Sequence, residues 1–118
     1  MIESIGELNK RVEIIKISNE KNERGYPEAN EQSITKCWAA VRDASYKTTE
    51  HYTAALGKAT EITDFIVRDM VIRKHGIRAG MYIRYHGELY KIIARPYEGN
   101  HDRNYVNLHT QIDSEVSG

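Results

Sequence analysis

The chain has 118 residues, 40% of them hydrophobic and 29% charged. This length can bury a hydrophobic core without disulfide or metal cross-links, and we expect one domain over residues 1–118. The 17 basic and 17 acidic residues give a formal net charge of +0, which disfavours a protein that grips nucleic acid through its phosphates. The single cysteine, Cys37, excludes an intramolecular disulfide and suits a reducing compartment, where we expect it to be a buried, inert thiol. No apolar run approaches the roughly 20 residues of a membrane-spanning helix, and the N-terminus is too polar for a signal peptide, so a cytoplasmic protein is expected.

The first part of the chain predicts two strands separated by a polar loop. The run LNKRVEIIKI favours a strand from about Arg11 to Ile17. Residues 18–33, SNEKNERGYPEANEQS, hold almost no large apolar side chain besides Tyr26. Such a stretch buries too little surface to order itself, so a long mobile loop is expected. ITKCWAAVRDAS restores the strand pattern, and Trp38 is expected to anchor the core.

Residues 45–60 change from a strand period to a helical one. An apolar stripe at i, i+3, i+4 and i+7 begins at Tyr52, and Ser45 is placed to cap the start of a helix. Gly57 interrupts the pattern, and a glycine inside a helix costs about 1 kcal/mol relative to alanine. The segment is therefore interpreted as a short helix or as a mobile insertion that becomes helical in context.

The following segments predict further short strands. EITDFIVRDMVIRK is rich in β-branched residues and favours a strand through Phe65 and Val67, then a second strand piece through Val71 and Ile72. A second polar loop, RPYEGNHDRNY, precedes the last strand, YVNLHTQI. Residues 113–118 are polar and are expected to fray.

Residues 80–92, GMYIRYHGELYKI, predict a hairpin that turns at Gly87-Glu88. Neither face is cleanly polar, because Ile83 lies on one face and Tyr82 and Arg84 lie on the other. The eight tyrosines of the chain suit burial against another protein, since the ring packs while the hydroxyl reaches a polar partner. Half-exposed strand tyrosines explain the pattern equally well. We expect the second face to be covered by the helix, by another subunit or by both.

These elements indicate a mainly β protein: a small β-barrel or sandwich of about six short strands, with one short helix and long polar loops. Closure of the sheet would protect its edges. The residues expected to form the structural core are Trp38, Val41, Phe65, Val67, Ile83, Tyr90 and Ile92.

The sequence offers little support for catalysis. It has no glycine-rich phosphate loop, CxxC, HExxH or nucleophile elbow, and its five histidines lack the spacing of metal ligands. We therefore expect no catalytic residue, no metal site and no cofactor. Asp64 and Asp69 flank an apolar run, and strand-end or outward-facing positions explain both. Basic residues interleaved with tyrosines would suit a small single-strand-binding barrel, but acidic residues are equally numerous and equally spread.

Three stretches, in this order, resemble the phage head–tail joining family, which comprises head–tail adaptor and head-closure (stopper) proteins: IGELNKRVEIIK, WAAVRDAS and DFIVRDMVIRKHGIRAGMYIRYHGELYKI. The resemblance covers about residues 4 to 110. The family's closing turn and hairpin pattern is matched by Ile77, Gly80, Met81, Gly87, Tyr90 and Ile92. In the segment between Trp38 and Phe65 the family often carries a Ser-Gly-x-Glu element. This chain has Tyr46-Lys47 where glycine is common, and this departure leaves the geometry of that segment open.

The resemblance implies a structural protein and not an enzyme. It would be a neck (connector) component of a tailed phage or prophage, assembled in the host bacterial cytoplasm, that joins the DNA-filled head to the tail. Implied partners are the portal or adaptor protein, tail proteins, and further copies of the chain in a ring, expected to be a dodecamer, through which DNA passes without sequence-specific binding. In some members a mobile loop closes the channel. Another neck role (adaptor or tail terminator) and a small nucleic-acid-binding barrel stay open as alternatives, as does the state of the free protein, ring or monomer.

Contacts with partners or neighbouring subunits are assigned, as a hypothesis, to the polar loops, the 45–60 segment and one hairpin face. The 45–60 segment is the candidate for facing the channel or a neighbouring subunit. The residues of this hypothesis are Lys21, Arg24, Tyr26, Tyr46, Lys47, Tyr52, Tyr82, Arg84, Tyr97, His101 and Arg103.

Overall fold

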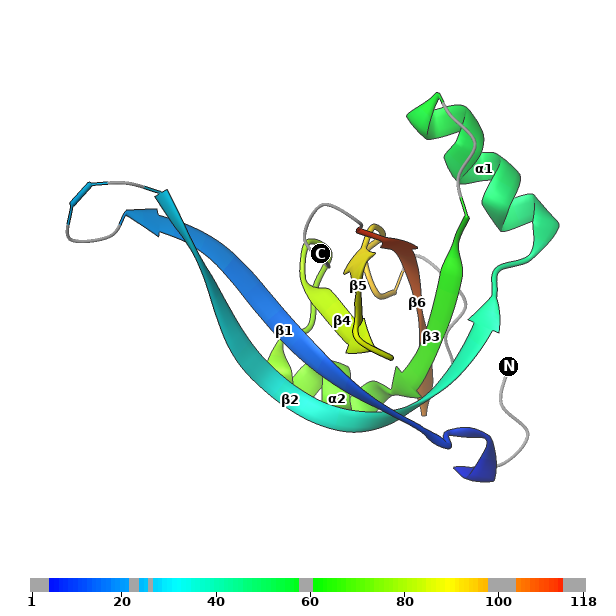
Figure 1. The fold of residues 1–118 in the computed structure, drawn as a ribbon. Coiled ribbons are helices and arrows are strands. Elements are labelled where there is room, and N and C mark those ends of the chain that lie inside the picture. Colours follow the sequence, from blue (N-terminus) through cyan, green and yellow to red (C-terminus); the bar gives the residue numbers. More distant parts are fainter. Residues whose placement is uncertain (1–4, 22–23, 26, 58–60, 98–103, 114–118) are drawn as a thin grey trace.

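The computed structural model describes residues 5–21, 24–25, 27–57, 61–97 and 104–113, and its centre is a closed barrel (Figure 1). The strands follow the order β1-β2-β3-β6-β5-β4 around the barrel, and every neighbouring pair is antiparallel. The strands are β1 (Lys10–Lys21), β2 (Pro27–Asp43), β3 (Thr63–Arg68), β4 (Tyr82–Tyr85), β5 (Glu88–Ile92) and β6 (Tyr105–Ile112). The helical segments of the described chain are a 3-10 helix (Ile5–Glu7), α1 (Tyr46–Leu56) and α2 (Asp69–His75). The small, mainly β barrel predicted from the sequence is confirmed.

Alternating side chains of the strands fill the barrel, as the two-residue period of a strand requires. Phe65 on β3 lies opposite Leu108 on β6, and both are completely buried. The Phe65 ring makes edge-on contacts with the rings of Tyr85 and Tyr90, at centroid distances of 5.8 and 5.1 Å. The buried cluster consists of Val12, Ile14, Cys37, Ala39, Phe65, Val67, Ile72, Ile77, Met81, Ile83, Ile92, Val106 and Leu108.

Trp38 does not belong to this core, and its prediction as a core anchor is wrong. Its neighbours Cys37 and Ala39 on β2 point into the barrel, so Trp38 points outward, and 53% of its surface is exposed. The guanidinium of Arg11, directly opposite on β1, lies 5.2 Å from the centre of the Trp38 ring. The other residues expected in the core lie inside the barrel or against it: Phe65, Val67, Ile83 and Ile92 are completely buried, and Val41 and Tyr90 are partly buried.

The predicted polar loop over residues 18–33 is also corrected by the structure. β1 and β2 stay paired from Lys10↔Ala39 to Lys21↔Pro27, so most of this stretch is strand. Beyond Ile15, where the pairing of β1 with β4 ends, the two strands pair only with each other. This part, residues 16–21 and 27–32, is called the ribbon below, and it projects from the barrel in Figure 1. Its sequence is mostly polar, and its order comes from the backbone pairing of β1 with β2, which continues outward from the barrel.

Residues 69–75 form α2 instead of the expected strand through Val71 and Ile72. Asp69 lies in the first turn and its carboxylate accepts a hydrogen bond of 2.7 Å from Arg73 Nε, one helical turn later. Basic residues close the last turn, where they complement the helix dipole, and Gly76 ends the helix with a φ of 62°. Ile72 is buried in the barrel cluster, so α2 packs against the barrel. Local capping and this tertiary contact outweigh the β-preference of two branched side chains.

α1 begins after Ser45, whose Oγ accepts a hydrogen bond of 3.2 Å from the backbone N–H of Thr48. It ends at Gly57, which has a φ of 71°, so this glycine is a C-terminal cap and not an interruption inside the helix. None of the residues of α1 is buried. In Figure 1, α1 stands apart from the barrel at one end, on the side away from α2.

The β4–β5 hairpin turns one residue earlier than predicted. Its two turn residues are His86 and Gly87, with φ values of 52° and 77°. Two successive left-handed residues form a type I′ turn, whose twist matches that of the flanking strands. Glycine adopts this conformation freely, whereas His86 is one of the polar residue types that tolerate it.

Candidate interaction surfaces

The base of the ribbon is fastened to the barrel by Arg84 of β4. Its Nη1 donates to Glu13 Oε1 at 3.2 Å and its Nη2 donates to Glu31 Oε2 at 2.7 Å. Glu13 lies directly opposite Arg84 in the β1–β4 register and also accepts a 2.8 Å hydrogen bond from Ser33 Oγ. The hydrogen bond to Glu31 raises the pKa of Arg84 against the opposing effect of burial. Arg84, assigned from the sequence to a partner contact, is thus engaged within its own chain, where it covers part of the second hairpin face.

The ribbon tip holds other residues of the sequence hypothesis. Lys21 is the last residue of β1, and Arg24 is exposed beyond it. Tyr26 lies outside the described residues, as do His101 and Arg103 in the β5–β6 connection.

α1 carries the residues Tyr46, Lys47 and Tyr52. Tyr46 is 78% exposed and its hydroxyl donates a 2.6 Å hydrogen bond to Glu50, which raises the pKa of the phenol. Lys47 is exposed. Tyr52 is half-buried, and its ring lies 5.9 Å, centre to centre, from the ring of His109 on β6. Most of the helix surface is therefore available for contacts outside the chain.

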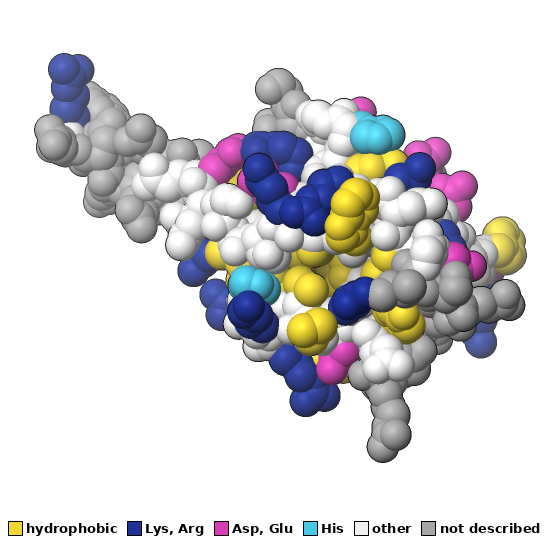
Figure 2. Space-filling model, turned by 90° about the horizontal axis from the view of Figure 1, so that it is seen from below, with side chains coloured by type: hydrophobic (Ala, Val, Ile, Leu, Met, Phe, Trp, Pro, Cys, Tyr) yellow, Lys and Arg dark blue, Asp and Glu magenta, His cyan; other side chains and the backbone are white. Residues whose placement is uncertain are grey.

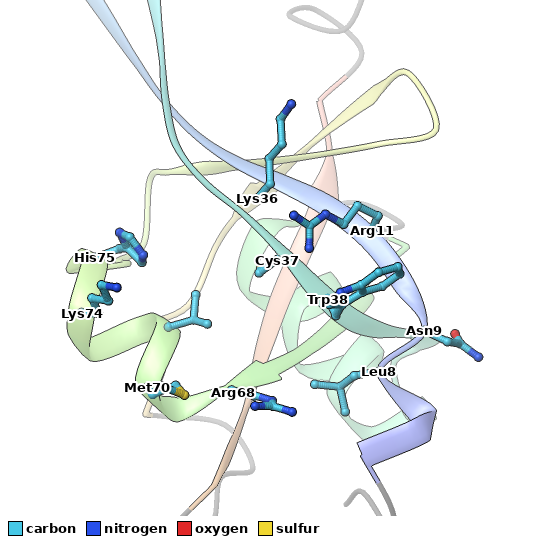
Figure 3. Close-up of a pocket in the computed structure, with 11 residues that line it drawn as sticks. Leu8, Asn9, Arg11, Lys36, Cys37, Trp38, Arg68, Met70, Lys74 and His75 are labelled. Atoms are coloured by element: carbon cyan, nitrogen blue, oxygen red, sulfur yellow. The ribbon is translucent and has the colours of Figure 1, made fainter.

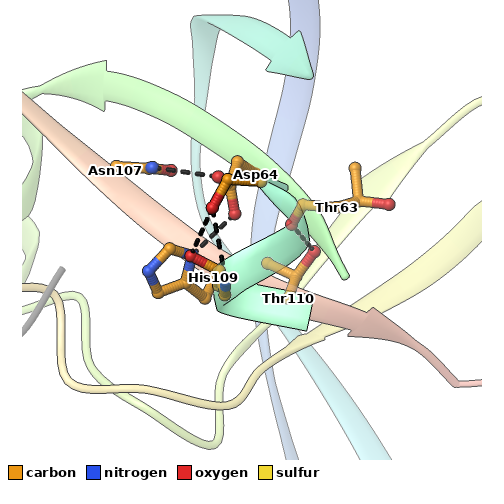
Figure 4. A network of polar contacts seen from close by, with 7 residues as sticks. Thr63, Asp64, Asn107, His109 and Thr110 are labelled. Carbon is orange, nitrogen blue, oxygen red and sulfur yellow. Dashed lines mark hydrogen bonds and ion pairs between the residues drawn. The ribbon is translucent and has the colours of Figure 1, made fainter. Parts of the chain in front are cut away.

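A polar network links β3 to β6 beneath α1 (Figure 4). Asp64 lies directly opposite His109 in the register, and its Oδ1 is 2.6 Å from His109 Nδ1. Asp64 Oδ2 accepts a 3.0 Å hydrogen bond from the buried amide of Asn107, and Thr110 Oγ1 donates to the backbone carbonyl of Thr63 at 2.7 Å. These bonds join two strands and orient the His109 ring that Tyr52 of α1 contacts.

The remaining residues of the sequence hypothesis lie apart from one another. Tyr82 is half-buried on β4, where burial, followed by the influence of Asp113, raises its pKa. Tyr97 lies against α2: its hydroxyl donates to Asp69 Oδ1 at 2.5 Å, and the Arg73 guanidinium lies 5.8 Å from its ring centre. The structure therefore distributes the predicted contact residues over the ribbon, α1, the β4 face and α2, and does not bring them into one site.

A groove that sequence reasoning missed lies between β2 and α2 (Figure 3). The pairing of β2 with β3 ends at Ala40↔Ile66, and the chain turns into α2 at Asp69, so β2 and α2 separate. The resulting cavity has a volume of about 660 Å³. Its lining consists of Leu8, Asn9, Arg11, Lys36, Cys37, Trp38, Arg68, Met70, Val71, Lys74 and His75. We call it the α2 groove.

The lining of the α2 groove has a strong chemical bias. Trp38 and Met70, 53% and 63% exposed, are large apolar side chains at the surface. Arg11, Lys36, Arg68 and Lys74 surround them, and the lining contains no carboxylate. Figure 2, which views the molecule from below, shows apolar side chains bordered by lysine and arginine.

Cys37 lies at the bottom of the groove. It is 7% exposed, and burial raises the pKa of its thiol to about 11, with Arg11 acting in the opposite direction. A thiol held neutral at ordinary pH is a poor nucleophile, so Cys37 contributes an apolar surface and not reactivity.

Comparison with known proteins identifies the family. Residues 4–112 match the model of the phage head completion protein family. The chain belongs to this family. Phage head completion proteins are structural components of the virion with a role at the neck, where head and tail meet, and they associate with other phage head or tail proteins. The family is not an enzyme family.

The fold has a counterpart among solved structures. The solution structure of protein SF1141 from Shigella flexneri 2a superimposes with a TM-score of 0.69 over 95% of this chain and 98% of that chain, at 21% sequence identity. This likeness concerns the fold alone. A search of curated protein sequences found no match. Within the described ranges, no helix has the length and apolar character needed to cross a membrane, and no group of three or more His, Cys, Asp or Glu side chains is arranged to hold a metal ion.

Proposed function

We propose that this phage head completion protein is a neck connector that forms a ring between the DNA-filled head and the tail. The observation that carries the proposal is the family match combined with two elements, the ribbon and α1, that project from the closed barrel. The strands β3, β4, β5 and β6 each pair with a neighbour on both sides. They offer no open edge for lateral pairing, so the projecting elements are the natural contacts between subunits.

α1 supports this proposal most directly. An isolated helix of 11 residues is marginal in water, and α1 buries none of its residues against its own barrel. Stabilising contacts from a neighbouring subunit or neck protein would complete it. Tyr46, Lys47 and Tyr52 are the residues we propose for that contact, with α1 facing either a neighbour or the DNA channel.

The ribbon is the second proposed contact. Lys21 ends β1 at the outer end of the ribbon, Arg24 follows it, and Arg84 holds the base, so the tip would reach a neighbouring subunit or neck protein while the barrel stays in place. Tyr26, which precedes Pro27 in the sequence, is proposed for the same contact. Tyr82, Tyr97, His101 and Arg103 complete the proposed contact set.

Charge supports free passage of DNA through such a ring. The formal net charge of +0 avoids a phosphate-gripping channel, whose binding would oppose sliding. We propose a ring of about twelve subunits that assembles on the portal or adaptor protein in the host cytoplasm, and that closes the channel after packaging. The neighbouring neck roles, adaptor and tail terminator, differ in which protein is bound.

Substitutions on α1 test the proposal. Tyr46→Ala and Lys47→Glu change exposed side chains, so the unfolding free energy should move by less than about 0.5 kcal/mol. In complementation of a phage that lacks this protein, the double variant should give DNA-filled heads and free tails that fail to join. Arg78→Glu, at an exposed basic residue between α2 and β4 that is not in the proposed contact set, is the matched control and should leave joining intact. Normal joining by the Tyr46/Lys47 variant would contradict the assignment of α1.

A further inference from the structure

The α2 groove is a binding surface that the proposed ring contacts do not use. Figure 1 places α2 at the opposite end of the barrel from α1, and the groove residues Trp38 and Met70 belong to neither the ribbon nor α1. Its volume of about 660 Å³ falls within the range of roughly 300–1,000 Å³ that is typical of ligand-binding pockets.

The cations around the groove are available for an incoming charge. Within the part of the chain that the structure describes, Arg11, Lys36, Arg68 and Lys74 have no carboxylate in ion-pair contact. Elsewhere Arg42 and Arg73 each have at least one carboxylate partner, and Arg84 has two. A cluster of unpaired cations in a chain of zero net charge attracts an anionic partner and disfavours a cationic one.

The backbone beside the groove is also open to a partner. Between residues 27 and 39, β2 has β1 as its only strand partner among the described residues, because its pairing with β3 begins at Ala40. A free strand edge accepts an extended segment by strand addition, in which backbone hydrogen bonds supply affinity and side-chain pockets supply specificity.

We propose that the α2 groove binds an extended acidic segment of a partner protein. An apolar side chain of that segment enters between Trp38 and Met70, over Cys37 and Val71, and its carboxylates meet Lys36 and Lys74 at the rim. Burial of the apolar side chain on the floor of the groove holds the segment in place, and the positive charges at the rim favour a segment of negative charge.

Two other occupants fit the groove less well. Single-stranded nucleic acid is usually held on successive aromatic platforms, whereas the groove has one large ring, Trp38, with the Arg11 guanidinium 5.2 Å from its centre. A second copy that docked through the same face would bring the four cations against themselves, because a twofold interface places a patch on its own equivalent.

Trp38 is the only tryptophan of the chain, so its fluorescence reports occupation of the groove in the purified protein. A short synthetic peptide that alternates Glu or Asp with Leu should shift the emission to shorter wavelength in a saturable manner. Its affinity should fall by about tenfold or more at high ionic strength. A peptide with Lys in place of the acidic residues, and an acidic peptide with Ser in place of Leu, should each bind at least about tenfold more weakly.

Variants locate the binding. Lys36→Glu, Lys74→Glu and Met70→Asp, all at exposed positions, should each weaken the acidic Leu peptide by about tenfold or more. Lys91→Glu makes the same charge change outside the groove and should bind like the parent protein. Urea unfolding midpoints show whether each variant retains its fold.

Several outcomes would overturn the proposal: no response to the acidic Leu peptide, equal weakening by Lys91→Glu, or preference for the Lys peptide. An oligonucleotide that binds more tightly than the peptide would identify a nucleic-acid site instead. A shift of Trp38 emission with protein concentration alone, removed by Lys36→Glu, would identify a second copy as the occupant. None of these measurements uses heads or tails, so failure here leaves the neck assignment unaffected.

Discussion

Removal of the ribbon should abolish head–tail joining while the barrel remains folded. Ile17 and Glu31 are partners in the β1–β2 register, so an Asn-Gly turn can join them and replace Ser18–Asn30. Two-residue turns of this type close narrow, hydrogen-bonded pairs, and narrow and wide pairs alternate along an antiparallel ladder. A second variant that joins Ser18 to Asn30 therefore ensures that one of the two junctions has the favourable geometry.

The structure predicts a small effect on stability. Among the removed residues whose side chains are described, none is buried, and the retained Glu31 keeps its 2.7 Å hydrogen bond from Arg84. A two-stranded ribbon in water is marginal by itself, so the loss of its ladder costs little. Replacing 13 residues by two reduces the loop-closure penalty by at most about 1.7 kcal/mol, from (3/2)RT ln(13/2). The unfolding free energy should therefore change by less than about 2 kcal/mol in either direction.

Two assays decide the outcome. Urea unfolding followed by circular dichroism measures the free energy, and complementation of a phage that lacks this protein measures joining. A loss of more than about 3 kcal/mol, beyond the typical range of single substitutions, would show that the ribbon belongs to the folding unit. Normal joining by a stable truncated variant would show that the ribbon is not an assembly contact.

Three further predictions concern the barrel, the groove and α1. Phe65→Ala should lower the unfolding free energy by about 3–5 kcal/mol because the ring is completely buried. Trp38→Ala should lower it by about 1–2 kcal/mol because 53% of the Trp38 surface is exposed. Equal losses for the two variants in urea unfolding would contradict the outward position of Trp38. The Cys37 thiol should react slowly with a disulfide reagent at pH 8, and labelling as fast as in urea would refute its burial. The pKa of this thiol is raised from 9.0 to about 11, so its neutral form contributes stability fully below pH 9, and this contribution is lost as the pH rises to 11. Over this range the wild-type protein should therefore lose unfolding free energy relative to Cys37→Ala. Ser45→Ala should speed amide hydrogen exchange in α1, since a helix cap contributes about 1 kcal/mol to helix stability. Exchange in the barrel should stay unchanged. Faster exchange throughout the barrel would show that α1 and the barrel unfold together.

The barrel could be predicted because its strands are short runs rich in β-branched and aromatic residues, separated by turn residues. Phe65 and Val67 lie opposite the apolar Leu108 and Val106, and the β-branched run around them favours a strand although Ile66 between them is also buried. The glycine of the β4–β5 turn marks a hairpin. The cap at Ser45 could also be predicted, because a serine directly before a helical pattern commonly accepts a hydrogen bond from the first turn of the helix.

Two elements could not be read from local pattern. The ribbon is polar on both faces, so its strands lack an apolar stripe, and their order comes from pairing across a long sequence separation. α2 has seven residues and contains Val71 and Ile72, which favour strands when considered alone.

Trp38 shows a different kind of error. The size of a tryptophan ring favours burial, but the alternation of Cys37 and Ala39 with Trp38 places the ring on the outer face of β2. Cys37 and Ala39 are small enough to point into the narrow barrel, whereas the large ring of Trp38 lies outside the barrel, beside Arg11. The α2 groove was invisible for this reason and because its lining comes from three separated segments, residues 8–11, 36–38 and 68–75.

The central claim, a neck protein that joins head to tail, is tested most directly on tailless, DNA-filled heads from a phage that lacks this protein. Purified protein is added, unbound protein is removed by sedimentation, and the copies per head, the retained DNA and the capacity to accept tails are measured. We predict that many copies bind each head, near the twelve of the proposed ring, that DNA is retained, and that added tails attach. Heads that bind no protein, or that bind it and still accept no tails, would contradict the claim.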